Sequence, residues 1–410
     1  AGAWCGQNKY LSAIKNAFQN FMPLTIAGAI GVLWCNVLVN ESTGLGIFFK
    51  PIMALEFLNP AFQAVNFCTI SCITVGITLG IAQEIGVWNM GAERAGYIPG
   101  LVGLAAWLSV TNTSHMVEGA KEAFTGIAGN ELGATGLFTG MIIGVLSVEL
   151  FCFFEKQDAL KIKMPEQVPP GVARAFEVLV PATITLIITA CIGSACYNLT
   201  GLYLNDVIKN GIQGPLGAVG ATIPGVMIIY LVIMLFWLVG IHGNNMLSAV
   251  KEALFTPLAL ENVEKFNKGE KPTNIINMYA LQMWGEFGGS GVTIGLVIAI
   301  MIFGKREDNK AIATLSLVPG LFNINETVTF GIPMVLNPIL GIPFVVAPLI
   351  TIIIGYVLTV IGFCPVACLT VPWTTPPIVF GFLACGANVM GAVTQAILIV
   401  VSTVIYVPFL

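Results

Sequence analysis

Long apolar stretches alternate with short polar ones along almost the whole chain. The run at 226–239 is apolar on every face of a helix, whereas a transmembrane β-barrel would alternate apolar and polar residues with a period of two. At about 20 residues for each helical crossing, the chain is long enough for about ten transmembrane helices. The apolar stretches lie at about 21–39, 64–82, 96–110, 134–154, 176–199, 218–240, 275–303, 341–362 and 388–409. We therefore expect an all-α polytopic membrane protein, in which the number of crossings between 244 and 304 stays open.

Two segments of the second half contain residues that interrupt a membrane helix. The first, near 311–338, holds Glu326 between amides and is broken by glycines and prolines, at Pro319, Gly320, Gly331, Pro333 and Pro338. The second, near 371–387, begins Val-Pro-Trp-Thr-Thr-Pro-Pro. Irregular backbone at membrane depth persists only where protein or a water-filled cavity satisfies its polar groups. Both segments are therefore predicted to be re-entrant hairpins, the first turning near Asn325, and such pairs are typical of a transporter binding site.

The composition excludes several classes of protein. Hydrophobic residues make up 56% of the 410 residues and charged residues only 9%, against about 25% charged in soluble proteins. The lipid bilayer is thus the expected surroundings, and a net charge of only -4 argues against a nucleic-acid partner. The ten cysteines lie mostly inside apolar segments and lack the spacing and the histidines of a zinc site, so we predict no metal or cofactor.

Basic residues set the expected orientation. One short connection, 155–174, contains Lys156, Lys161, Lys163 and Arg174. The positive-inside rule places this connection in the cytoplasm. Four crossings precede it, so the N-terminus is also expected in the cytoplasm and the loop 111–133 outside. Residue 1 is Ala, and we expect the natural start of the protein to lie upstream of it.

The chain is expected to divide into an amphipathic interfacial lead-in, a first membrane domain, a linker and a second membrane domain, at 1–20, 21–199, 200–217 and 218–410. Glycines stand four residues apart in the first membrane domain, at Gly76 and Gly80, Gly96 and Gly100, and Gly136, Gly140 and Gly144. Such glycines line one helix face and let helix backbones approach closely. They could serve packing within the chain or an interface between two copies, and the sequence leaves both open.

Polar groups that should avoid apolar surroundings collect in a few places. They are Glu326, Asn325, Asn323, His242, Asn244 and Arg94, accompanied by the aromatic residues Trp237, Trp373 and Phe330. Carboxylate, amide and imidazole groups exchange hydrogen bonds with sugar hydroxyls, and indole rings cover the apolar face of a sugar. A carboxylate beside a histidine can also orient or deprotonate one hydroxyl. These residues are therefore a candidate sugar site.

Several of these residues have a second interpretation. Glu326 could lie in an ordinary surface loop or cap a helix, and His242 could be a hydrogen-bonded packing residue. Trp237 and Trp373 could belong to an aromatic belt at the lipid interface. The stretch 251–272, which follows the histidine, carries several charges and is expected to face water.

Three motifs in the second half resemble one known family, in the same order along the chain. Asn-Ile-Asn-Glu at 323–326, with Phe-Gly-Ile-Pro at 330–333 and Asn-Pro at 337–338, is similar to the signature hairpin of the membrane-embedded IIC subunits of the sugar phosphotransferase system. Gly-Ile-His-Gly at 240–243 after Trp237, and Trp-Thr-Thr-Pro at 373–376, resemble two further segments of that family. The combination resembles its lactose, cellobiose and diacetylchitobiose branch. Thr327 stands where the family usually has Pro.

The resemblance implies a function in the inner membrane of a bacterium. Such a subunit binds a sugar, here a β-linked disaccharide or related glycoside, from outside. An elevator-like motion of a transport domain, 218–410, against the dimerisation domain of a homodimer, 21–199, then carries the sugar across. A separate IIB protein phosphorylates the sugar from a phosphocysteine, so this chain would be a sugar phosphotransferase only together with IIB.

The resemblance also implies roles for the residues of the candidate site. Glu326 and His242 would contact the hydroxyl that accepts the phosphoryl group. The sugar itself would be held by Asn325, Trp237, Trp373, Asn323, Arg94 and Asn244. Arg94 is the loosest of these assignments, because the stretch 83–95, expected to be a loop, matches no sharp motif of the family.

A proton-coupled secondary transporter would show the same features. In that class Glu326 would carry the proton, and the sugar would arrive unphosphorylated. An ion channel would need rings of like charge or a carbonyl filter, and the sequence shows neither. The product, phosphorylated or free sugar, separates the first two classes, and the sequence does not name the sugar.

Overall fold

The computed structural model describes residues 8–40, 46, 49–115, 123–165, 167–215, 220–332, 334 and 337–410. Parts of four predictions lie outside these residues: the start of the lead-in, the middle of the loop 111–133, the end of the linker, and Pro333 of the first hairpin. The described chain is almost entirely helical. It has one antiparallel pair of two-residue strands, β1 (Ser114–His115) and β2 (Phe124–Thr125), with Ser114 opposite Thr125. The predicted all-α polytopic fold is confirmed.

The chain divides into two compact units. The first, here called the 69–216 unit, comprises Ala3–Leu24 and Thr69–Leu216. The second, here called the 217–410 unit, comprises Ala1–Gly2, Thr25–Cys68 and Gly217–Leu410. The sequence prediction grouped 25–68 with the first half of the chain, whereas its contacts group it with the second half. The dimerisation and transport roles given to the two halves stay predictions.

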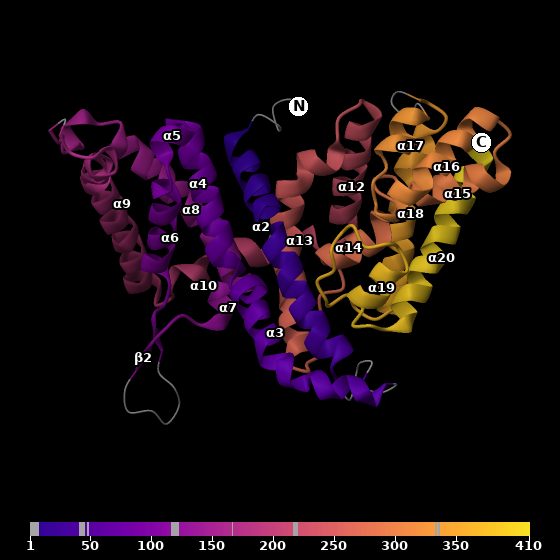
Figure 1. Cartoon of the computed structure of the whole chain (residues 1–410), viewed down its shortest axis with the longest axis horizontal. Coiled ribbons are helices and arrows are strands. Elements are labelled where there is room, and N and C mark those ends of the chain that lie inside the picture. The colour runs from indigo at the N-terminus through magenta and orange to yellow at the C-terminus, as the bar shows by residue number, and fades with distance from the viewer. Residues whose placement is uncertain are drawn as a thin grey trace. The chain divides into compact units, whose positions relative to one another are not determined.

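The 69–216 unit is built around helices that pack on one another (Figure 1). Its elements follow the first part of α2 (Lys9–Leu33) and are η4 (Phe67–Ser71), α4 (Ile73–Met90), α5 (Ala92–Ala95), α6 (Ile98–Val110), β1, β2, α7 (Gly129–Leu132), α8 (Ala134–Glu155), η5 (Asp158–Leu160), α9 (Pro170–Thr200), α10 (Leu204–Ile208) and η6 (Lys209–Gln213). Helices α4, α6 and α8 contact one another. Ile77, Ile81 and Ile85 recur every four residues, so they share one face of α4, and all three are fully buried.

Two of the four-spaced glycines, Gly80 and Gly140, serve packing inside this unit. A Cβ atom on Gly140 of α8 would overlap the hydroxyl of Thr78 on α4. A Cβ atom on Gly80 of α4 would lie 3.1 Å from the Cβ of Ala17 on α2. Because the small residues let these helices approach closely, the structure answers the open question at both glycines in favour of packing within the chain.

The 217–410 unit has a larger apolar core and a more broken chain. Its elements are the second part of α2, η1 (Trp34–Leu38), η3 (Lys50–Leu58), α3 (Asn59–Asn66), α12 (Ile223–Leu238), α13 (Gly243–Asn267), α14 (Met278–Gly285), α15 (Ile294–Phe303), α16 (Glu307–Leu321), α17 (Glu326–Gly331), α18 (Gly341–Val360), α19 (Val379–Ala384), α20 (Val389–Tyr406) and η7 (Val407–Phe409). Helix α20 packs against α15, α18 and α19, as the orange and yellow ribbons of Figure 1 show. The largest buried side chains of the core are Trp284, Tyr230, Tyr406, Phe255, Phe287 and Phe344.

The first predicted hairpin reverses direction where the sequence indicates. Helices α16 and α17 contact each other and are joined by residues 322–325. A Cβ atom on Gly331 of α17 would touch the side chain of Ile312 on α16, so the two arms lie side by side. The turn near Asn325 is thus present, and its depth in a membrane stays a prediction.

The second predicted hairpin is broken in a different way. Residues 361–378 have little regular structure, and the short helix α19 comes between them and α20. The side-chain oxygen of Gln395 on α20 accepts hydrogen bonds from the backbone N–H groups of Ile378 and Gly381, at 2.7 and 2.8 Å. This side chain supplies partners that an unbroken helix would have found in its own backbone.

In the part of the chain that the structure describes, fewer single helices are long and apolar enough to cross a membrane than the about ten crossings predicted from the sequence. Within the described residues, five are long and apolar enough: Lys9–Leu38, Ala134–Glu155, Pro170–Thr200, Gly341–Val360 and Val389–Phe409. The bent pair Lys50–Ser71 and Ile73–Met90 would make six. The helices α6, α12 and α15 are apolar but shorter. The predicted crossing at 64–82 is interrupted at η4, and the apolar stretch 275–303, whose number of crossings was left open, is interrupted at residues 286–293.

The predicted loop 83–95 is wrong, because α4 continues to Met90 and α5 follows it directly. The polar side chains that indicated a loop find partners inside the 69–216 unit. The carboxylate of Glu84 accepts a hydrogen bond from the amide of Asn16 at 2.8 Å, and the amide of Gln83 donates to the carbonyl of Gly96. A helix can therefore continue through these residues without leaving buried polar groups unpaired.

Replacing Gly140 by Ala is expected to destabilise the protein. The added methyl group would overlap the Thr78 hydroxyl and lie 2.8 Å from Cγ2 of Thr74, and overpacking of this kind costs about 1–3 kcal/mol. Thermal unfolding in detergent measures the effect. Gly171→Ala is the matched control, since nothing lies within 4 Å of its added Cβ. Equal melting temperatures for the two variants would contradict the close packing of α4 and α8.

Candidate functional site

Asn323 joins three irregular segments of the 217–410 unit. It lies in the turn of the first hairpin with a left-handed backbone, φ 62°. Its side-chain oxygen accepts a hydrogen bond from the backbone N–H of Gly288 at 2.6 Å. Its side-chain nitrogen donates to the carbonyl of Trp373, and to that of Thr375 at 3.3 Å. One amide thus holds the hairpin turn against residues 286–293 and against the segment that carries Trp373.

Asn325 is the second amide of the turn, and it is buried with 4% exposure. Its side-chain nitrogen donates to the carbonyl of Ser290 at 2.8 Å. Gly289, with φ 87°, lies directly under it, and a Cβ atom there would be 2.6 Å from Cγ of Asn325. Only glycine combines that backbone conformation with the space that the amide occupies. Asn325 therefore fixes the hairpin to the loop 286–293.

Glu326 and His242 come together from separate elements. Glu326 is the first residue of α17, and His242 caps the N-terminus of α13, where its Nδ1 accepts a hydrogen bond from the backbone N–H of Asn245 at 3.3 Å. The Nε2 atom of His242 lies 3.8 Å from Oε1 of Glu326, and the two side chains are 38% and 47% exposed. In the neutral ring the proton is consequently on Nε2, the atom that faces the carboxylate.

The two predicted indole rings have different surroundings. Trp237 is only 3% exposed, and the centroid of its ring lies 4.4 Å from that of His242. The ring centroids of Phe330 and Phe344 each lie 6.4 Å from that of Trp237. Trp373 is 43% exposed and its backbone is held by Asn323. The geometry thus gives Trp237 a supporting position against the imidazole and leaves the ring of Trp373 accessible, while sugar binding by both stays a prediction.

Asn244 belongs to a polar network that the sequence analysis missed. Its side-chain nitrogen donates to Oγ of Ser290 at 2.9 Å, and its oxygen accepts from Nζ of Lys251 at 3.3 Å. Lys251 also forms an ion pair with Glu286, whose carboxylate accepts a hydrogen bond from the hydroxyl of Tyr230 at 2.7 Å. The network places buried charges within hydrogen-bonding reach of the loop that receives the hairpin.

The expectation that 251–272 faces water is wrong for its first part. Helix α13 runs unbroken from Gly243 to Asn267, and Lys251 is only 6% exposed. The signal was present in the spacing, because residues 244 and 251 are two helical turns apart and share one face. Glu286, an acid in an otherwise apolar stretch, supplied the opposite charge. A buried charge needs such a partner, and the periodicity could have placed Asn244 and Lys251 on one helix face, although it could not have paired Lys251 with Glu286.

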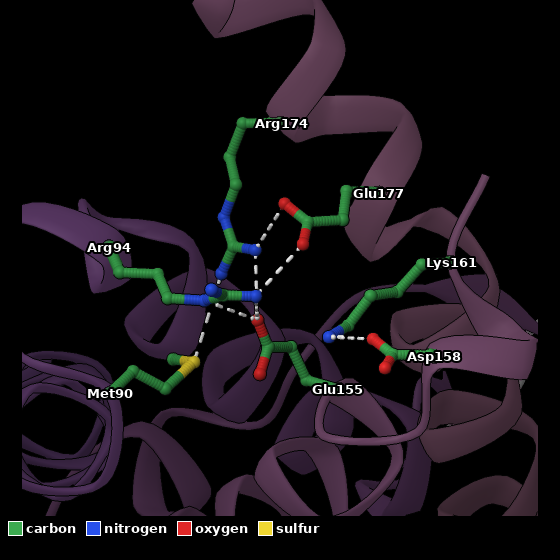
Figure 2. A network of polar contacts seen from close by, with 7 residues as sticks. All are labelled: Met90, Arg94, Glu155, Asp158, Lys161, Arg174 and Glu177. Carbon is green, nitrogen blue, oxygen red and sulfur yellow. Dashed lines mark hydrogen bonds and ion pairs between the residues drawn. The ribbon is translucent and has the colours of Figure 1, made fainter. Parts of the chain in front are cut away.

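Arg94 lies in the 69–216 unit and has a separate set of partners, drawn in Figure 2. Its Nε donates to Glu155 at 2.9 Å and its Nη2 to Glu177 at 2.8 Å. Arg174 binds the same two carboxylates, at 2.9 and 2.8 Å. The network ties the ends of α8 and α9 to α5, which gives Arg94 a structural use. Its assignment to the sugar stays a prediction.

The remaining groups can act together on one hydroxyl. The gap of 3.8 Å between Nε2 of His242 and Oε1 of Glu326 is longer than a hydrogen bond, so a hydroxyl oxygen can approach both atoms. The imidazole N–H can donate to that oxygen while the carboxylate accepts its proton. The amides of Asn323 and Asn325 are already occupied by backbone groups. The two amides therefore support the candidate site, and the polar groups left to contact a sugar are those of His242 and Glu326.

Comparison with known proteins gives the chain a family. A family model described as "Phosphotransferase system, EIIC" matches residues 15–348. The oligo-beta-mannoside-specific EIIC component of Bacillus subtilis is 33% identical over 98% of this chain and 89% of its own length. The cellobiose-specific EIIC component of Lactococcus lactis is 30% identical over 98% of this chain and 94% of its own length.

A solved structure agrees with these relatives. The transporter ChbC, the IIC component of an N,N'-diacetylchitobiose-specific phosphotransferase system, matches with a TM-score of 0.90 and 29% identity, covering 99% of this chain and 94% of ChbC. The predicted resemblance is thus confirmed, and with it the expectation of sugar transport by the phosphotransferase system in a bacterial membrane. The chain belongs to the EIIC family of the phosphotransferase system, as a membrane-embedded sugar transporter of the cellobiose and lactose group.

Proposed function

We propose that this chain carries a β-linked disaccharide or related glycoside across the membrane and presents it to a separate IIB protein, whose phosphocysteine phosphorylates it. The names of the relatives support this sugar class, since oligo-beta-mannoside, cellobiose and diacetylchitobiose are all β-linked. A IIB partner is supported by the lactose-specific EIICB component of Streptococcus mutans, which is 27% identical over 98% of this chain and 69% of its own length. Its name joins a C and a B component in one chain.

The observation that carries the proposal is the facing pair of His242 and Glu326. Both side chains are partly exposed, whereas the neighbouring amides of Asn323 and Asn325 are bonded to backbone groups. His242 is one of two histidines in the sequence, and Glu326 is the one acidic residue between 311 and 338. Their separation suits a hydroxyl that must be held and then deprotonated.

Phosphoryl transfer depends mainly on placing the acceptor oxygen in line with the donor. Nε2 of His242 would donate to the sugar hydroxyl and fix its oxygen, while Glu326 would accept the hydroxyl proton as the new P–O bond forms. The S–P bond of the IIB phosphocysteine would break at the same time, and its sulfur would depart as a thiolate. The exposed ring of Trp373 would cover the apolar face of the sugar.

The division into two compact units supports an elevator-like motion. All of the paired site residues lie in the 217–410 unit, so this unit could carry the sugar as one body. The 69–216 unit would then supply the fixed part and the contact between two copies. Its helix α9 exposes apolar side chains along its length, at Leu179, Ile187 and Ile192 among others. We propose that part of this face meets a second copy and that the remainder meets lipid.

The proton-coupled alternative is not favoured by the family match. It would use the same carboxylate without any phosphorylated product. The two classes therefore differ in chemistry that one assay can follow, namely whether labelled sugar inside vesicles is phosphorylated.

Glu326→Gln is expected to lower the rate of sugar-phosphate formation by at least about 100-fold, because the amide cannot accept the hydroxyl proton. Sugar binding should weaken by about 1.5–3 kcal/mol, the usual loss of a hydrogen bond to a charged group. The measurements are binding of labelled cellobiose to purified protein and separation of free and phosphorylated sugar after mixing with phosphorylated IIB.

Glu270→Gln is the matched control, because Glu270 is an exposed glutamate of the same unit. It should leave both quantities unchanged. A Glu326→Ala protein that phosphorylates cellobiose at the normal rate would remove the hairpin from the site. Retained exchange of free sugar with lost proton-driven uptake would instead identify a proton carrier.

The connection 155–174 is expected to face the cytoplasm and the loop 111–133 the outside, following the basic residues. Single cysteines at two exposed positions, Gln157 and Thr125, test this in a background without native cysteines. A membrane-impermeant maleimide added to intact cells should label the cysteine at 125 alone. Labelling at 157 would reverse the orientation.

Copies of the chain are expected to associate through the 69–216 unit. Single cysteines at Leu179, Ile187 or Ile192 on α9 should give a disulfide-linked dimer under mild oxidation in native membranes, provided the position lies near the two-fold axis. Val400 on α20 is the control, being similarly exposed in the other unit. Cross-linking at 400 with none along α9 would place the interface in the 217–410 unit.

A further inference from the structure

A buried ion pair lies one hydrogen-bonded step from the candidate site. Lys251 on α13 is 6% exposed and pairs with Glu286, the residue that ends α14. Tyr230 of α12 donates to the same carboxylate oxygen. Burying two charges requires desolvation that their attraction repays only in part, so a buried pair is weak evidence of a device for stability. Its place in the network gives it another use.

A chain of hydrogen bonds runs from this pair to the hairpin. Nζ of Lys251 donates to Oδ1 of Asn244 at 3.3 Å, and Nδ2 of Asn244 donates to Oγ of Ser290 at 2.9 Å. The carbonyl of Ser290 accepts from Nδ2 of Asn325 at 2.8 Å. Asn325 precedes Glu326 in the chain, and Asn244 lies two residues after His242. The path therefore begins on the helix that carries the imidazole and ends at the residue beside the carboxylate.

The path connects the segments that carry His242 and Glu326. At 3.8 Å, Nε2 and Oε1 are too far apart to hold each other by a hydrogen bond. The imidazole is fixed to the start of α13, and the carboxylate to a hairpin seated on the loop 286–293. Lys251 bonds at the same time to Asn244 at the start of α13 and to Glu286 at the start of that loop. Lys251 thus connects the start of α13, which carries His242, to the loop 286–293, on which the hairpin with Glu326 rests.

We propose that Lys251 and Glu286 are positioning residues for phosphoryl transfer, which hold the start of α13 against the loop 286–293 and so keep His242 and Glu326 at the separation that one sugar hydroxyl requires. The proposal rests on the proposed function, because it concerns the same two groups and the same hydroxyl. It adds two residues that need not touch the sugar.

The test removes the pair without leaving an unpaired charge. In the double variant Lys251→Met/Glu286→Gln, the methionine keeps the length of the lysine's aliphatic stem, and the glutamine oxygen can still accept from Tyr230. The ammonium group's bonds to residues 286 and 244 are lost, together with its contact with the ring of Tyr230. The matched control is Lys268→Met/Glu264→Gln, the same two changes in an exposed ion pair at the end of the same helix. Each protein is assayed for thermal unfolding, labelled-cellobiose binding, and the rate of cellobiose-phosphate formation with phosphorylated IIB.

The double variant should unfold at nearly the wild-type temperature and bind cellobiose with a Kd raised by no more than about threefold. Its rate of phosphoryl transfer should fall at least about tenfold, because a small misplacement of the acceptor oxygen lowers the rate more than the affinity. The control should match the wild type in all three assays. A wild-type transfer rate in the double variant would overturn the proposal. So would a joint loss of thermal stability, binding and rate, which would make the pair a device for stability. If the wild type binds cellobiose and forms no phosphate, the proposed function itself fails and this inference fails with it.

Discussion

Backbone groups of a broken chain in apolar surroundings must find partners inside the protein, and buried amide side chains supply many of them here. In the 217–410 unit, Asn262 accepts from the backbone of residues 273 and 274 and donates to the carbonyl of Ala367. Asn277 donates to that same carbonyl, and Gln395 bonds residues on both sides of the break before α19 as well as the carbonyl of Met283. An amide suits the task because one group both donates and accepts. The irregular segments on which the site lies therefore depend on these bonds.

The same constraint separates the residues that support the candidate site from the residue that it exposes. Asn323 and Asn325, two residues apart, are both committed to backbone groups of other segments. Glu326, next in the chain, remains partly exposed. A carboxylate presented in this way can change its partner or its protonation state without loosening the fold around it. Rigid support behind an accessible acid is what a group that handles a substrate proton requires.

Each of the two units is stabilised internally by a different kind of contact. In the 69–216 unit, small residues such as Gly80 and Gly140 let long helices approach closely and make van der Waals contact along their backbones. Near the ends of α8 and α9, the carboxylate of Glu155 is held by two guanidinium groups (Figure 2). In the 217–410 unit the helices are interrupted, and polar side chains bridge the interruptions. Such an architecture leaves loops and half-helices free to line a polar site, which continuous helices cannot provide.

The sequence by itself determined the class of protein, the two interrupted segments and the candidate residues of the site. Apolar runs on every face require lipid, and prolines and glycines around Glu326 require a break, so these predictions follow from local chemistry. Only the tertiary structure decided which residues these side chains contact. Lys251 appeared to belong to a water-facing stretch, the surroundings of Trp237 were open, and Gly140 suited a core and an interface equally. The ring of Trp237 meets that of His242, five residues further along, only because the chain breaks between α12 and α13. Lys251 and Gly140 depend on residues distant in sequence, Glu286 and Thr78, and one sequence contains no record of which residues meet across such distances.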